Sequence, residues 1–183
     1  MIIMKKTITI SAILLLTAAL AINAQARDSK PANKPSLGFS ISQYQKDFGI
    51  GVHFLTPYFF NDILAVKIGG NIQWLEYSNP DAGWTPYGNL QLGVRGREFI
   101  IENKVSLYGE GGLVIILPNS KFSSRNFQAG GYGLFGFEFM LDSGISYFIE
   151  MGGIGTGACA DKVPGRPIYS NGFLTNVGFR YSF

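Results

Sequence analysis

The chain has 183 residues, of which 24 are glycine and 26 are aromatic (15 Phe, 9 Tyr and 2 Trp), and its formal net charge is +3. It contains no run of basic residues, which argues against a nucleic-acid-binding protein. Beyond residue 26 no segment reaches the roughly 18 consecutive apolar residues of a membrane-spanning helix. The aromatic content argues against a disordered chain. This composition favours an all-β protein.

The N-terminal 26 residues have the three parts of a cleavable secretory signal. Lys5 and Lys6 form a basic start, residues 8–22 form an apolar run, and Ala24-Gln25-Ala26 supplies a cleavage site. The alternative is a membrane anchor, for which the run is short. We expect cleavage after Ala26, followed by a disordered periplasmic lead over residues 27–35. The remaining chain would carry 13 basic and 12 acidic residues, a net charge of +1.

Eight later segments alternate apolar residues with small or polar ones, as strands do when only one face is apolar. They cover residues 37–41, 48–54, 64–74, 90–94, 105–117, 135–141, 145–151 and 173–183. Short connections such as 57–62 and 142–144 alternate with longer ones over 78–86, 118–126 and 158–171. Short periplasmic turns and long external loops are typical of outer-membrane barrels. We therefore predict a closed, antiparallel, up-and-down transmembrane β-barrel of eight strands over residues 36–183.

The last segment carries aromatic residues at alternate positions and ends on Phe183, preceded by Phe179 and Tyr181. This arrangement resembles the assembly signal of bacterial outer-membrane barrels. With the leader and the eight segments, it makes the chain similar to the small outer-membrane β-barrel proteins of Gram-negative bacteria, of the OmpA membrane-domain and OmpX type. The resemblance implies residence in the outer membrane, contact with its lipid and lipopolysaccharide, and assembly by the barrel assembly machinery.

The less apolar face of the eight segments carries few charges, and these balance. They are three cations and three anions, namely Lys67, Arg95, Arg180, Glu110, Glu138 and Glu150. A solvated surface would carry more, so we predict that this face points inward and that the six form an ion network filling a narrow barrel. Removing charges from water costs several kcal/mol per ion, so each needs a partner. The alternative is a soluble lipocalin-like barrel, with the apolar face inside around a small apolar ligand.

Aromatic residues are expected to form girdles where the barrel crosses the two membrane surfaces. The group expected at a periplasmic turn is Tyr58, Phe59 and Phe60. The group expected around an external loop is Trp74, Tyr77, Trp84 and Tyr87.

Few residues carry recognisable chemistry. A single His and a single Cys, His53 and Cys159, provide no metal-ligand set, and we expect neither a metal nor a cofactor. Tyr169-Ser170-Asn171 resembles part of the His-Ser-Asn region of lipid A deacylase barrels, but Tyr169 stands where the histidine base would be. A serine nucleophile needs such a base. His53, on another strand, is expected to be a hydrogen-bonded interior residue.

We therefore expect a non-catalytic barrel with a structural or interaction role in the cell envelope, or an accessory subunit of a larger membrane complex. A protein partner would bind through the external loops, and no nucleic acid is expected. A lipid A-modifying hydrolase using Ser170 and a soluble lipocalin-like binder are the alternatives.

Overall fold

The computed structural model describes residues 33–76, 84–101, 104–141 and 143–183. The predicted leader, residues 27–32 of the predicted lead, and Tyr77 lie outside these ranges. Among the described residues, no helix is long and apolar enough to cross a membrane.

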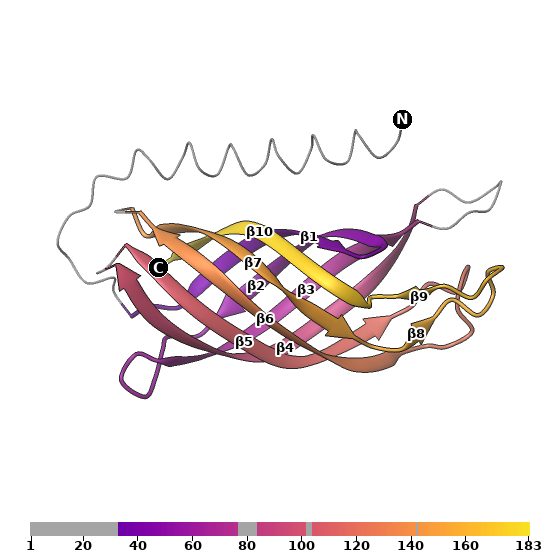
Figure 1. Ribbon diagram of the computed structural model, residues 1–183, viewed down its shortest axis with the longest axis horizontal. Helices are drawn as coiled ribbons and strands as arrows, with labels where there is room; N and C mark the ends of the chain where they lie inside the picture. The colour runs from indigo at the N-terminus through magenta and orange to yellow at the C-terminus, as the bar shows by residue number, and fades with distance from the viewer. Residues whose placement is uncertain (1–32, 77–83, 102–103, 142) are drawn as a thin grey trace.

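Eight long strands form one closed antiparallel barrel, in which each strand pairs with its neighbours along the chain and the last pairs with the first (Figure 1). Their bounds are β1 Ser36–Tyr44, β2 Asp47–Leu55, β3 Leu64–Leu75, β4 Thr85–Ile101, β5 Val105–Leu117, β6 Gln128–Met140, β7 Ile145–Gly155 and β10 Gly172–Ser182. The predicted fold class and strand number are confirmed. Most strands are longer than the alternating segments, because small residues such as Gly130 continue the hydrogen-bonded ladder where the apolar pattern fades.

The apolar face of the wall points outward. Ile68, Leu92 and Leu113 are 55%, 53% and 66% exposed, whereas their neighbours Lys67, Gln91 and Gly112 lie on the opposite face. Such an exposed apolar belt on a closed barrel is the arrangement that suits a membrane, since closure also satisfies the backbone hydrogen bonds of every strand. A soluble barrel would bury this face instead.

The start of β1 and the end of β10 lie side by side at one end of the barrel, where Ser36 pairs with Ser182. Strands β2, β4 and β6 also end here, whereas β3, β5 and β7 end at the opposite end, which carries β8 and β9 and lies at the right of Figure 1. Following the orientation expected from the sequence, we call the first the periplasmic end and the second the external end.

Two external loops, residues 118–127 and 156–171, fold against one another. The second contains the short antiparallel pair β8 (Ala158–Cys159) and β9 (Ile168–Tyr169), which the sequence pattern did not predict. The Lys162 amide donates to the Phe122 carbonyl at 3.1 Å, and the Ser124 amide donates to Asp161 at 2.9 Å. Phe122 is fully buried and packs edge-on against Tyr169. The loops therefore form an ordered cap on this end of the barrel.

Two residues placed in the aromatic girdles lie elsewhere. Tyr58 is buried, with the Arg97 guanidinium 3.5 Å above its ring. Tyr87 points into the barrel mouth, because it shares the inward face of β4 with Asn89 and Arg95. By contrast, Phe59, Phe60 and Trp84 are exposed, and Trp74 and Trp84 flank Phe48 at the external rim.

Candidate functional site

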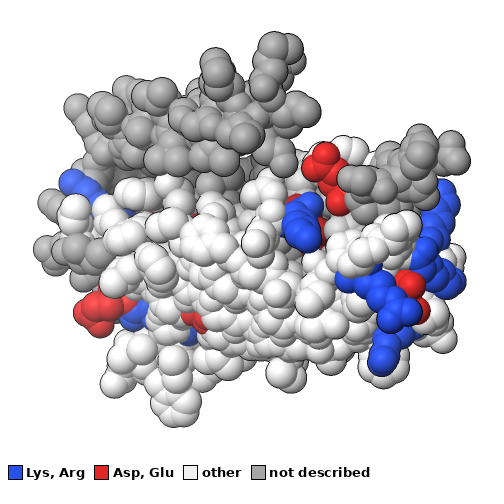
Figure 2. Space-filling view, turned by 45° about the vertical axis from the view of Figure 1, so that its right-hand side comes forward, with Lys and Arg blue, Asp and Glu red and all other residues white. Residues whose placement is uncertain are grey.

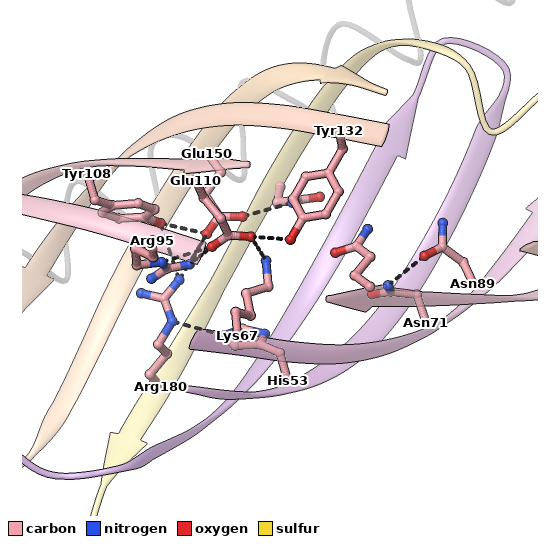
Figure 3. A network of polar contacts seen from close by, with 12 residues as sticks. His53, Lys67, Asn71, Asn89, Arg95, Tyr108, Glu110, Tyr132, Glu150 and Arg180 are labelled. Atoms are coloured by element: carbon pink, nitrogen blue, oxygen red, sulfur yellow. Dashed lines mark hydrogen bonds and ion pairs between the residues drawn. The ribbon is translucent and has the colours of Figure 1, made fainter. Parts of the chain in front are cut away.

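Six strands contribute one charged side chain each to the barrel interior. We call this set the interior network: Lys67 (β3), Arg95 (β4), Glu110 (β5), Glu138 (β6), Glu150 (β7) and Arg180 (β10). Strand alternation turns each of them inward, and each is at most 5% exposed. The structure thus brings all six residues together in one buried cluster. Figure 3 shows all of them except Glu138.

Glu110 holds one half of the interior network. Its Oε1 lies 2.5 Å from Lys67 Nζ, and its Oε2 accepts hydrogen bonds from Arg95 Nε at 2.9 Å and Nη2 at 2.6 Å. Arg95 and Glu110 are direct partners in the β4–β5 register, whereas Lys67 reaches Glu110 from one strand further away. The Tyr132 hydroxyl donates a further hydrogen bond to Glu110 at 2.9 Å.

Glu150 joins this half to the other. Its Oε1 lies 3.0 Å from Arg95 Nη2 and 2.9 Å from Arg180 Nη2. The Tyr108 hydroxyl donates to the same oxygen at 2.6 Å, and Asn176 donates to Oε2 at 2.8 Å. One carboxylate of β7 therefore receives bonds from three other strands, β4, β5 and β10, and ties separate parts of the wall together.

Arg180 has the most varied surroundings of the six. Its Nη1 forms an ion pair with Glu138 Oε1 at 2.9 Å, and its Nε donates to His53 Nε2 at 2.9 Å. Its guanidinium carbon lies 3.9 Å from the centre of the Phe148 ring, which supplies a cation–π contact. His53 is thus engaged within the interior, as a hydrogen-bond acceptor.

Several interior partners were not identified from the sequence as members of the site. Tyr108 is fully buried, donates to Glu150 and lies 4.0 Å beneath the Arg95 guanidinium. Ser146 donates to Glu138 at 2.5 Å. The alternation that turned Glu110 inward also turns Tyr108 inward, so this signal was present. The contacts themselves depend on the stagger between strands, which alternation does not reveal.

Charge balance allows this cluster to exist out of water. Three cations and three anions interleave, and each carboxylate accepts at least one hydrogen bond from a neutral side chain. Desolvation of an unpaired ion would cost several kcal/mol, so the network is stable only as a complete set. Because its paired charges are bonded across the lumen, the network lies in the path that a solute would take and can block it.

A second polar group lies nearer the external end, and we call Asp47, Tyr87 and Ser170 the mouth cluster. The Tyr87 hydroxyl donates to Asp47 Oδ2 at 2.7 Å and lies 2.6 Å from Ser170 Oγ. The Ser170 amide also donates to Asp47 Oδ2, at 2.5 Å. Ser170 is fully buried and has a left-handed backbone (φ 47°), which this bond to Asp47 helps to hold. The mouth cluster fastens the cap to the start of β2.

The environment of Ser170 is that of a structural hydroxyl. Its neighbour Tyr87 already donates its proton to Asp47, and His53 is bonded to Arg180 in the interior network. The described residues contain no group of three His, Cys, Asp or Glu side chains arranged to hold a metal ion. Phe179 and Tyr181 of β10, and Phe183 directly after it, are each about half exposed.

Comparisons with known proteins agree with this architecture. Residues 12–183 match the family described as outer membrane protein beta-barrel domain. A search of curated protein sequences finds no match. Among solved structures, the crystal structure of the N-terminal β-barrel domain of Pseudomonas aeruginosa OprF is similar in fold, with a TM-score of 0.58 and 11% identity, covering 82% of this chain and 98% of that one. The chain therefore belongs to the outer membrane protein beta-barrel domain family.

Proposed function

We propose that the protein is a non-catalytic integral protein of the outer membrane, with a structural or interaction role in the cell envelope. The interior network carries this proposal. Charged side chains from six strands meet in the lumen and are at most 5% exposed, which leaves no wide path for a solute. An eight-stranded barrel is narrow enough for side chains to fill it.

The mouth of the barrel supports the same role. The two external loops pack on each other through Phe122 and Tyr169, and the mouth cluster joins them to β2 and β4. A rigid cap of this kind presents a fixed surface to the outside, which suits binding to a protein partner or membership of a larger membrane complex. It does not suit transport.

A hydrolytic role for Ser170 is the less favoured function. A nucleophile must be reachable by its substrate and must have a base to accept its proton. Ser170 is fully buried, and its hydroxyl partner is Tyr87, which is committed to Asp47.

The test combines location, closure and activity. Cells are fractionated, and the outer-membrane fraction is run on a gel with and without boiling. We expect the protein in this fraction, with a faster unboiled band, and no resolved single-channel conductance in planar bilayers. Recovery in the periplasm, or channels wide enough for organic solutes, would contradict the proposal. Mass spectrometry of lipid A tests the alternative, which requires an acyl chain to be lost with the wild type and retained with Ser170→Ala.

We also propose that the terminal strand is recognised during assembly by the barrel assembly machinery. Phe179, Tyr181 and Phe183 lie on the outer wall of β10 and on the residue that follows it. Phe183→Ser should lower the amount of folded barrel in the outer membrane severalfold, whereas Phe173→Ser, on the same face at the external end, should not. Equal effects of both substitutions would show that only general apolarity matters.

A further inference from the structure

A hollow of about 540 Å³ lies at the external rim, where β6 begins and β7 ends. It is lined by Arg125, Asn126, Phe127, Gln128, Ala129 and Thr156. The hollow thus has a cation, several hydrogen-bonding groups and an aromatic ring that is 66% exposed. It lies at the boundary between the polar cap and the apolar wall.

The charge around this hollow is positive. The two external loops carry four cations, Lys121, Arg125, Lys162 and Arg166, and one anion, Asp161, which accepts hydrogen bonds from the amide and hydroxyl of Ser124. Within the described part of the chain, the Arg125 guanidinium forms no hydrogen bond or ion pair. Figure 2 shows Lys and Arg side chains gathered at the end of the barrel that carries these loops. An unpaired guanidinium is well suited to bind phosphate through paired hydrogen bonds.

Below the hollow, the outer wall carries a patch of exposed backbone that we call the glycine face. Gly111, Gly133 and Gly153 are paired in one row across β5, β6 and β7, and Gly131 pairs with Gly155 in the next row. Ala129 and Thr156 of the hollow adjoin these glycines along β6 and β7, so the hollow opens directly onto the glycine face.

The barrel itself does not require these glycines. A Cβ atom at Gly133 would meet nothing within 4 Å, and one at Gly111 or Gly153 would make only ordinary contacts at 3.7–3.8 Å. None of the five has a positive φ. Glycine weakens a strand relative to alanine, and in a strand it often marks a place where a ligand approaches the backbone closely. The fold of the barrel therefore does not explain the glycine face, and a molecule that binds there would.

Two occupants would fit such a surface, a second copy of the barrel or an amphiphile, and the positive charge of the external loops favours one of them. A second copy of this barrel, packed wall to wall through the glycine face, would bring the same cationic loops towards each other, which is unfavourable. An amphiphile with an anionic headgroup satisfies both features at once, because its headgroup binds the cation and its chain lies on the smooth apolar wall. Basic pockets at membrane surfaces bind lipid headgroups in this way.

We propose that the hollow and the glycine face bind one lipid A molecule, the phosphorylated and acylated anchor of lipopolysaccharide. A phosphate binds Arg125 in the hollow, and an acyl chain lies along Gly131, Gly133 and Gly153. The proposal rests on the proposed placement of the protein in the outer membrane, with the capped end facing outward.

Native mass spectrometry of the full mature protein, extracted from outer membranes in mild detergent, tests this site. The probe is bisphosphorylated lipid A, compared with the same lipid after removal of both phosphates. The test variants are Arg125→Glu, which reverses the charge in the hollow, and Gly133→Leu, which fills the glycine face. The matched controls are Lys46→Glu, an external cation on the β1–β2 turn, and Gly70→Leu, a glycine on the outer face of β3 where a Cβ has room.

We expect one lipid A per barrel, at least tenfold weaker binding in each test variant, and binding within twofold of the wild type in each control. Equal binding of the dephosphorylated lipid, or equal losses in test and control variants, would overturn the site. A disulfide cross-link between two barrels that carry Gly133→Cys, formed within the membrane, would overturn the lipid A site in favour of a dimer. Unchanged heat-modifiability of every variant shows that the barrel is intact, so a failure of lipid binding would leave the proposed function standing.

Discussion

Glu150 is the residue on which the interior network depends most, since it accepts bonds from Arg95, Arg180, Tyr108 and Asn176. Removing one member of a buried ion pair leaves an uncompensated charge, which typically costs about 3–5 kcal/mol. Glu150→Gln should therefore lower the free energy of unfolding in detergent micelles by about that amount. Urea titration measures it. Glu98→Gln, at an exposed glutamate of β4, is the control and should change stability by less than about 0.5 kcal/mol.

Two glycines of β6 provide a second residue-scale test, because they face opposite sides of the wall. A Cβ at Gly136 would collide with the Tyr108 ring and with Glu150 Cγ, whereas a Cβ at Gly133 would enter open space. Gly136→Ala should destabilise the barrel by about 1–3 kcal/mol, as overpacking does. Gly133→Ala should be neutral or stabilising by up to about 1 kcal/mol. The reverse order in the same unfolding assay would mean that the two faces are wrongly assigned.

At the scale of elements, the external cap depends on a contact between loops. The Ser124 hydroxyl and amide donate to Asp161 and lower the pKa of this carboxyl from 3.8 to about 2. Because the pKa is lowered in the folded loops, the contact is fully present above about pH 4 and is lost as the pH falls through about 2. The chemical shift of the Ser124 amide, followed by NMR, should titrate with a midpoint near pH 2.

Ser124→Ala provides the control for this titration, since it removes the hydroxyl donor but keeps the amide. We expect the Asp161 midpoint to move up towards its ordinary pKa of 3.8, and Asp161→Asn to abolish the titration altogether. A wild-type midpoint already close to 3.8 would show that the loops do not hold this contact in solution.

The whole molecule is defined by its apolar belt, and the cost of a charge on it should depend on depth. Leu92 lies in the middle of β4 and is 53% exposed, while Leu117 is the last residue of β5 at the external rim. Leu92→Arg should destabilise the folded barrel in bilayers by about 2–4 kcal/mol, and Leu117→Arg by about 0–1 kcal/mol. Similar costs at both positions, measured by unfolding from lipid vesicles, would mean that this wall does not face the hydrocarbon.

The sequence alone was sufficient to predict the barrel and the number of its strands. The reason is local: in a strand, successive side chains point to opposite sides. Lys67, Arg95 and Glu110 each alternate with the apolar residues of their own strand, and this places them on the less apolar face. The position of a residue within its own strand is therefore enough to predict its face, without knowledge of any distant residue. The same alternation also turns Tyr87 and Tyr108 inward, a signal that the girdle assignment of Tyr87 did not use.

Only the tertiary structure decided which groups meet. Glu150 binds Arg95 and Arg180 because the closed, staggered barrel brings β7, β4 and β10 to the same level of the lumen, and stagger is a property of closure. The mouth cluster joins Asp47 to Ser170 across 123 residues, and the glycine face arises from the register of three strands. Alternation determines the side to which a residue points, but its height on the wall and its neighbours depend on how all eight strands pair.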